Sequence, residues 1–180
     1  DCLSCKNLDR SNLRLLNLLE KARKLPGIKN IYIRSGIRYD LASKEYIRKI
    51  AEHHIFDTLR IAPEHVNNKV LKLMNKAEGS FKEFISFFDS LHCGKELSFY
   101  FITAHPGSGM EEAKELAAAL KGLKNVSLQV FTPTPMTVST CMYYTGMDPS
   151  IKQKIYVPHT YHEKKEQKRV VMKMLQEEIN

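Results

Sequence analysis

Hydrophobic and polar residues alternate along this chain in blocks that predict helices and strands in turn. Apolar residues recur at helical spacing over residues 13–22, and the Pro26-Gly27 pair ends that helix. The alternation of Ile31, Tyr32 and Ile33 then predicts a first strand, over residues 31–34. Repetition of these two kinds of segment favours one continuous α/β unit.

The same kinds of helix and strand signals recur to the end of the chain. Further strands are predicted over residues 58–61, 97–103 and 126–131, and further helices over residues 43–52, 67–74, 80–88, 111–120 and 162–176. Because each connection contains a helix, we expect a parallel sheet of about four strands with flanking helices. After Phe131 a Thr-Pro-Thr-Pro run predicts a long loop. We therefore expect a single α/β domain, with the sheet within residues 1–135 and a loop and C-terminal helix in residues 136–180.

Composition adds little to this picture. A length of 180 residues and a hydrophobic content of 43% fit one ordinary globular domain. Much of the net charge of +8 lies on predicted helices, where solvated helix faces explain it. The sequence has no apolar run of transmembrane length and no secretory signal, and its four cysteines are scattered, so we expect a cytoplasmic setting with reduced thiols or metal ligands.

Polar residues follow each predicted strand. In a parallel sheet the carboxyl ends of the strands share one edge, where ligands bind. The candidates at this edge are Arg34, Ser35 and Arg38 after the first strand, Glu64 and His65 after the second, Thr103, His105 and Gly107 after the third, and Thr132 and Thr134 after the fourth. The alternative for each is structural, because Ser35-Gly36 also suits a turn, Glu64 a helix start and Gly107 a loop.

Three stretches resemble radical SAM enzymes of the methylthiotransferase-like type. Residues 57–76 are similar to the fourth barrel strand and its Val-Leu-Lys-x-Met-Asn-Lys helix, residues 102–112 to the fifth strand and residues 130–135 to the sixth. Within that superfamily, residues 6–8, 34–40, 62–65 and 140–146 are similar to the YgiQ-like proteins. The resemblance implies the C-terminal portion of a partial (βα)6 radical SAM-type barrel, in an enzyme whose substrate is unknown.

The resemblance also shows what this sequence lacks. The family's CxxxCxxC loop, whose thiolates hold a 4Fe-4S cluster that binds S-adenosylmethionine, is absent, since the cysteines are Cys2, Cys5, Cys93 and Cys141. We therefore expect the chain to be the C-terminal part of a larger enzyme that uses both cofactors. Alone, it is expected to bind neither and to be catalytically silent.

Roles for individual residues follow from the resemblance alone. It implies that Arg34 and Ser35 approach the ribose or methionine part of the cofactor, and that Glu64 is directed at the cofactor. Phe131 and Thr132 would border the adenine. The loop after the third strand would shape the adenine site, although His105 and Ser108 stand where the family more often has Phe and Glu. The remaining residues of the expected cofactor-binding set are Arg38, His65, Thr103 and Gly107.

Several alternatives stay open. Cys2 and Cys5 form a CxxC pair that suits half a zinc site, part of an auxiliary iron–sulfur site, a redox pair or accidental spacing. The lysines and arginine of residues 164–169 and the tyrosine-bearing loop suit a basic module that binds RNA phosphates and bases. A purely structural α/β module is the third hypothesis. Finally, an unpaired edge at Ile31–Arg34 predicts either self-association through that edge or poor solubility.

Overall fold

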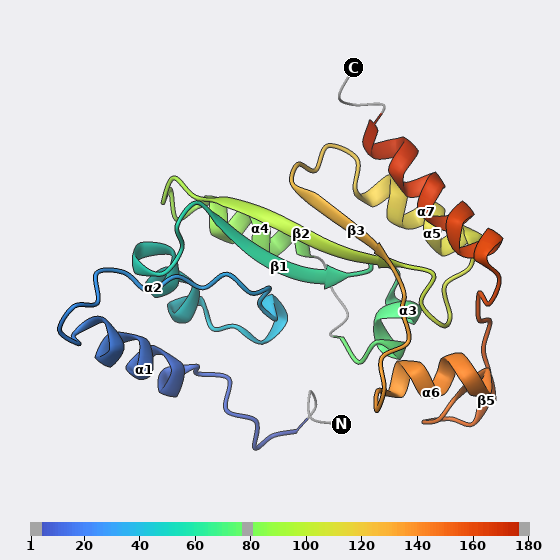
Figure 1. Cartoon of the computed structure of the whole chain (residues 1–180), viewed down its shortest axis with the longest axis horizontal. Coiled ribbons are helices and arrows are strands. Elements are labelled where there is room, and N and C mark those ends of the chain that lie inside the picture. Colours follow the sequence, from blue (N-terminus) through green and yellow to red (C-terminus); the bar gives the residue numbers. More distant parts are fainter. Residues whose placement is uncertain (1–4, 77–80, 177–180) are drawn as a thin grey trace. The chain divides into compact units, whose positions relative to one another are not determined.

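A three-stranded parallel sheet with flanking helices organises the molecule (Figure 1). The structure is a computed structural model that describes residues 5–76 and 81–176. Strands β1 (Thr58–Glu64), β2 (Glu96–Thr103) and β3 (Val126–Val130) are hydrogen-bonded in the order β1-β2-β3. The expected α/β class and parallel sheet are confirmed, with three strands in place of four. The described residues divide into two compact units, 5–63 with 81–99 and 64–76 with 100–176.

The first unit contains α1 (Leu13–Arg23), the short 3-10 helix η1 (Tyr39–Leu41), α2 (Lys44–His53) and α4 (Phe81–Asp89). Helix α2 begins where the sequence predicts, because the Ser43 hydroxyl accepts a hydrogen bond from the Tyr46 amide. Its Ile47 and Ile50 side chains are fully buried, as are Leu59 and Ile61 of β1. Burial of these apolar side chains forms the core of the unit.

The second unit contains α3 (Asn68–Leu73), α5 (Met110–Ala119), α6 (Val138–Thr145) and α7 (Tyr161–Gln176). Helix α7 lies beside α5 in Figure 1 and also contacts β3. Phe101, Leu116, Leu120 and Val171 are fully buried and form the apolar core here. No helix within the described residues is both long enough and apolar enough to span a membrane.

The predicted strand at residues 31–34 is not formed. The Ile33 amide instead donates to the His54 carbonyl, 2.8 Å away in the turn after α2. The segment reaches β1 only at Ile37, through one isolated parallel bridge to Ile61. Because a strand needs a ladder of such bonds, one bridge leaves this stretch irregular. Self-association through this edge stays a prediction.

The stretch after Phe131 is more ordered than the sequence predicts. It contains α6 and a two-stranded antiparallel sheet of β4 (Met147–Asp148) and β5 (Gln153–Lys154). Thr137 caps α6 by accepting from the Thr140 amide, and Gly146 ends it in the left-handed region at φ 65°. These signals were present in the sequence, but the prolines before them suggested a continuous loop.

Candidate functional site

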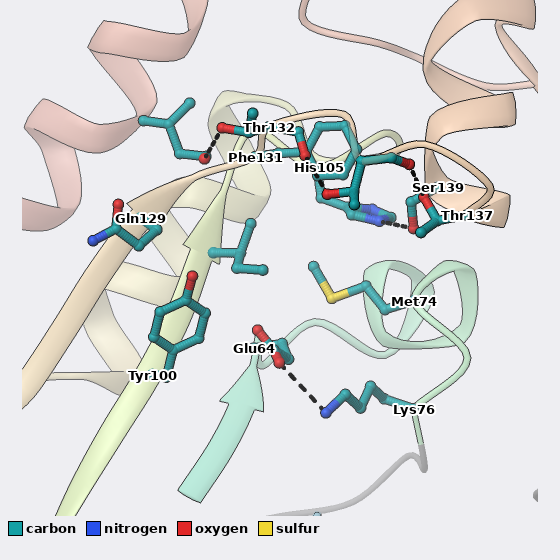
Figure 2. Close-up of a pocket in the computed structure, with 13 residues that line it drawn as sticks. Glu64, Met74, Lys76, Tyr100, His105, Gln129, Phe131, Thr132, Thr137 and Ser139 are labelled. Carbon is teal, nitrogen blue, oxygen red and sulfur yellow. Dashed lines mark hydrogen bonds and ion pairs between the residues drawn. The ribbon is translucent and has the colours of Figure 1, made fainter. Parts of the chain in front are cut away.

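A cavity of about 480 Å³ lies within the second unit, where the sheet strands end (Figure 2). Its volume falls in the range of roughly 300–1,000 Å³ that is usual for small-molecule sites. The wall is a mixture of apolar, hydroxyl, amide and charged side chains. It is made by Glu64, Met74, Lys76, Tyr100, Ile102, His105, Gln129, Val130, Phe131, Thr132, Thr134, Thr137 and Ser139.

Strand β2 supplies one side of this wall through its two-residue alternation. Phe101 and Thr103 point to the buried side, whereas Tyr100 and Ile102 are half-buried and line the cavity. The chain continues the ladder one residue beyond β3, because the Phe131 amide donates to the Thr103 carbonyl at 2.8 Å. That hydrogen bond fixes Phe131 at the rim of the sheet.

Two strand ends are held in an unusual backbone conformation. Glu64 has φ 68° and Ala104 has φ 60°, in the left-handed region that residues other than glycine rarely adopt. Such residues cost of order 1–3 kcal/mol each and persist where surrounding contacts enforce them. At Ala104 the enforcing contact is buried Gln167, whose Oε1 accepts from the Ala104 amide at 3.0 Å. Strained residues of this kind concentrate at binding and catalytic sites, which supports the functional interpretation of the cavity.

An ion pair forms the charged part of the wall. The Lys76 Nζ lies 3.5 Å from the Glu64 Oε1, and the two side chains are 12% and 17% exposed. Figure 2 shows both reaching toward the cavity from the end of β1 and from the segment after α3. Charges withdrawn from water in this way interact more strongly than surface pairs. The cavity therefore offers a ligand one anionic and one cationic group side by side.

A second polar pair lies at the opposite wall, between His105 and Ser139. The His105 Nε2 is 2.8 Å from the Ser139 Oγ, and its Nδ1 is 2.8 Å from the Pro106 carbonyl oxygen. Burial lowers the pKa of His105 to about 4, so the ring is neutral at neutral pH. Its edge-on contact with Phe131, at 5.0 Å between ring centroids, places the pair beside the aromatic wall.

The cavity brings together five of the polar and aromatic candidates from the sequence, namely Glu64, His105, Phe131, Thr132 and Thr134. Three other candidates belong to the same unit but support the walls. His65 is buried and its Nδ1 accepts from the Asn67 amide at 3.0 Å, and burial lowers its pKa to about 4. Thr103 donates to the Gln129 carbonyl at 3.3 Å.

Gly107 is the third of these supporting residues. It has φ 89°, and a Cβ at this position would lie 2.2 Å from the Leu73 Cδ1. The backbone conformation therefore favours glycine, and a Cβ here would also force the Leu73 side chain to move. Its role in the described structure is packing.

The remaining candidates belong to the first unit. Arg34 and Ser35 are exposed, while Arg38 makes a bidentate pair with Asp40 at 2.8 and 2.5 Å. Ser35 and Arg38 line a separate cavity of about 460 Å³ within that unit, whose other walls include Leu15 and Leu19. Their expected role toward the cofactor stays a prediction.

Several lining residues were missed by the sequence analysis. The alternation of β2 could have identified Tyr100 and Ile102, and that of β3 could have identified Gln129. Lys76 is the last residue of the stretch that carries the resemblance, yet no role was assigned to it. Thr137 and Ser139 come from α6, which was not predicted. No local pattern in the sequence identifies Met74 as a lining residue.

The proposed metal ligands receive no structural support. Cys2 lies outside the described residues, and Cys5 is exposed with a free thiol. In residues 5–76 and 81–176, no three His, Cys, Asp or Glu side chains are grouped so that they could hold a metal ion. The role of the CxxC pair stays a prediction.

Comparison with known sequences identifies related proteins. A family model described as the Radical SAM superfamily matches residues 7–120. A UPF0313 protein of Clostridium botulinum is 39% identical over 176 residues, which cover 92% of this chain and 28% of that protein. A UPF0313 protein of Methanosarcina acetivorans is 42% identical over 169 residues, covering 89% of this chain and 23% of that protein. The chain thus spans about a quarter of the length of these relatives.

Solved structures show the same fold. Coproporphyrinogen III oxidase (HemN) from Escherichia coli, a radical SAM enzyme, aligns with a TM-score of 0.59 at 15% identity over 94% of this chain and 37% of its own. The Elp3 protein of Methanocaldococcus infernus aligns with a TM-score of 0.51 at 17% identity over 76% of this chain and 30% of its own. At these identities the likeness concerns the fold alone.

The comparisons confirm the family resemblance, and none supports the RNA-binding or purely structural alternatives. The family model covers more than half of the sequence, including the segments that follow β1 and β2 but not the one that follows β3. This chain therefore belongs to the Radical SAM superfamily.

Proposed function

We propose that the cavity of the second unit binds S-adenosylmethionine in a radical enzyme that also carries a 4Fe-4S cluster. One observation supports this most strongly. The Glu64–Lys76 ion pair and the Phe131 wall converge on a single cavity at the strand ends of a Radical SAM fold. Ligands of parallel α/β folds bind at this edge, so fold and side-chain chemistry agree.

The ion pair is complementary to the amino-acid end of S-adenosylmethionine. That end carries an ammonium group and a carboxylate, which can pair with the Glu64 carboxylate and the Lys76 ammonium respectively. Hydrogen bonds between charged groups are stronger than neutral ones, and the low exposure of both side chains limits screening by water. The pair would therefore orient the zwitterion as well as bind it.

The opposite wall suits the nucleoside end. The Phe131 ring offers an apolar surface for a planar base, and the Gln129 amide and Thr132 hydroxyl can pair with ribose hydroxyls. An apolar surface with a few polar groups that fix orientation is the usual composition of a small-molecule site. The residues present thus fit S-adenosylmethionine.

The residues present do not fit the iron–sulfur cluster. The four cysteines stand at positions 2, 5, 93 and 141 without a CxxxCxxC motif, and the described residues contain no metal-binding group. The cofactor and cluster together supply radical chemistry in this family, whereas the residues of this chain bind and orient the cofactor. We propose that the chain alone binds the cofactor without cleaving it.

This proposal revises one expectation from the sequence, that the chain alone binds no cofactor. All of the proposed contacts lie within one compact unit, so weak binding by the chain alone becomes the expected result.

The free thiols of Cys5, Cys93 and Cys141 suit a reducing compartment, which supports the expected cytoplasmic setting.

Calorimetric titration of the 180-residue chain with S-adenosylhomocysteine tests the proposal. This ligand keeps the adenosine and amino-acid groups but lacks the reactive sulfonium. We expect a Kd of roughly 0.1–1 mM. Glu64→Gln and Lys76→Met should each weaken binding about tenfold, because each removes a charge-assisted hydrogen bond.

The matched control for Glu64→Gln is Glu166→Gln, which removes a carboxylate of α7 that pairs with exposed Arg169 outside the cavity. It should leave the affinity unchanged. Absence of binding at millimolar ligand, or equal weakening by the control, would overturn the proposal.

A further inference from the structure

We infer that Ser139 selects a ligand whose ring presents an amino donor, so that the cavity binds adenine more tightly than hypoxanthine. The inference rests on the proposed function and concerns specificity within the same cavity. It is carried by the hydrogen-bonded chain that runs from the Pro106 carbonyl through His105 to Ser139.

The donors and acceptors in this series of hydrogen bonds are determined at its buried end. The Pro106 carbonyl oxygen can only accept a hydrogen bond, so the His105 Nδ1 at 2.8 Å must carry the proton. In a neutral imidazole the other ring nitrogen then has a lone pair. The His105 Nε2 therefore accepts, and the Ser139 hydroxyl at 2.8 Å donates to it.

This arrangement determines what the Ser139 hydroxyl can bind in the cavity. Once its single proton is directed at His105, the Ser139 Oγ presents only lone pairs to the cavity that it lines. A ligand donor such as an aromatic amino group can be bound there. A carbonyl oxygen at the same place would bring lone pairs against lone pairs, and it would also lose its hydrogen bonds to water.

The surroundings hold the pair in place. Ser139 lies in the first turn of α6, where the Thr137 hydroxyl accepts from the Thr140 amide at 3.2 Å. His105 is buried, and its ring packs edge-on against Phe131. Figure 2 shows His105 and Ser139 beside Phe131. A base that contacts Phe131 therefore has its edge close to the Ser139 hydroxyl.

A purely structural role makes a different prediction. If the Ser139–His105 bond serves only to satisfy a buried imidazole, the cavity has no preference between amino and carbonyl groups on the ligand. Substitution of Ser139 would then lower stability without changing which base is bound. The two interpretations are therefore separated by ligand preference.

The test compares S-adenosylhomocysteine with S-inosylhomocysteine, in which a carbonyl replaces the amino group and the adjacent ring nitrogen N1 carries a proton. Both are titrated into the full chain and three variants. The parent should bind the adenosyl ligand about fivefold to tenfold more tightly, the effect of one neutral hydrogen bond. Ser139→Ala should bind both ligands equally, and Ser139→Thr, which keeps the hydroxyl, should retain the preference. Ser150→Ala, an exposed serine outside the cavity, should behave as the parent.

Failure of the inference is distinguishable from failure of the proposed function. If the parent binds the adenosyl ligand but does not distinguish the two bases, or if Ser139→Ala keeps the preference, the inference is wrong and the cofactor site stands. If neither ligand binds, both are wrong.

A second readout requires no ligand, because nitrogen-15 NMR assigns the tautomer of His105. We expect the proton on Nδ1, and a proton on Nε2 would overturn the inference.

Discussion

The Lys76 ammonium lies 3.5 Å from the carboxylate of Glu64, a residue whose backbone is held at φ 68°. The strain and the ion pair occur at the same residue, at the end of β1 and in the wall of the cavity. A glycine would adopt this backbone conformation without penalty, but it would leave Lys76 without this partner. The arrangement is typical of a site where binding chemistry is kept at some cost in stability.

Glu64→Gly should therefore separate stability from binding. Relief of backbone strain and loss of the ion pair oppose each other, so we expect a free energy of unfolding within about 1 kcal/mol of the parent. Affinity for S-adenosylhomocysteine should fall at least about tenfold. Lys152→Gly, at φ 55° in the β4–β5 turn, is the control and should leave the affinity unchanged. Urea unfolding and calorimetry measure the two effects, and an unchanged affinity in Glu64→Gly would contradict the assigned role.

Gly107→Ala should be strongly destabilising. The new methyl group would combine an unfavourable backbone conformation at φ 89° with an approach of 2.2 Å to the Leu73 Cδ1. We expect a loss of about 2–4 kcal/mol in the free energy of unfolding. Gly146→Ala has a similar backbone conformation, at φ 65°, but no atom within 4 Å, so it should cost only about 1 kcal/mol. Equal losses in chemical denaturation would show that α3 is not held against this loop.

Gln167 joins α7 to the turn after β2, and its removal should disturb both. Its Oε1 accepts from the Ala104 amide and the Ser108 hydroxyl, and its Nε2 donates to the Ser108 carbonyl. Gln167→Leu would leave these buried groups unpaired at a cost of about 2–3 kcal/mol. Because Ala104 directly precedes His105, the affinity for S-adenosylhomocysteine should fall as well.

The control is Gln153→Leu, on an exposed residue of β5. It should change the free energy of unfolding by less than about 0.5 kcal/mol. If thermal and urea unfolding show the same small effect for both variants, Gln167 does not enforce the strained turn.

Stability should fall as the pH is lowered from about 7 to about 5. Burial holds the pKa values of His65 and His105 at about 4, below the value of 6.5 for a free imidazole. The unfolded chain therefore binds more protons between these values, and acidification favours unfolding. We expect a loss of about 2 kcal/mol per histidine at pH 5. The pKa of Glu163, which hydrogen bonds from Thr160 hold at about 2, affects stability only at lower pH.

The measurement is urea unfolding between pH 5 and pH 8, with His65→Gln and His162→Gln as a matched pair. His65→Gln should remove about half of the pH-dependent loss, because one of the two buried imidazoles is gone. His162→Gln removes an exposed imidazole and should change stability little. A pH dependence that is the same in both variants would show that burial of His65 does not produce the effect.

Local signals in the sequence were sufficient for most of the fold. The Ser43 cap and the apolar spacing of α2 predicted that helix within two residues of its observed bounds. The prediction failed at residues 31–34, where the pattern was that of a strand but the hydrogen-bond partner of Ile33 is the turn after α2. An alternating pattern indicates a half-buried extended chain, and it does not show whether a neighbouring strand is in register.

The site could be predicted only where it depends on strand ends. Glu64 and His105 were found because residues that follow parallel strands share one edge, and Phe131 was named from the family resemblance. Lys76 and Ser139 come from the segment after α3 and from α6, and their approach to the cavity depends on tertiary packing. No local pattern specifies such an approach.

Cofactor binding in the cavity of the second unit can be followed by the amide chemical shifts of the nitrogen-15-labelled chain during titration with S-adenosylhomocysteine. We expect saturable shifts concentrated at Glu64, Phe131, Thr132 and Ser139. Shifts confined to residues 31–38 of the first unit, or no shifts at millimolar ligand, would contradict it.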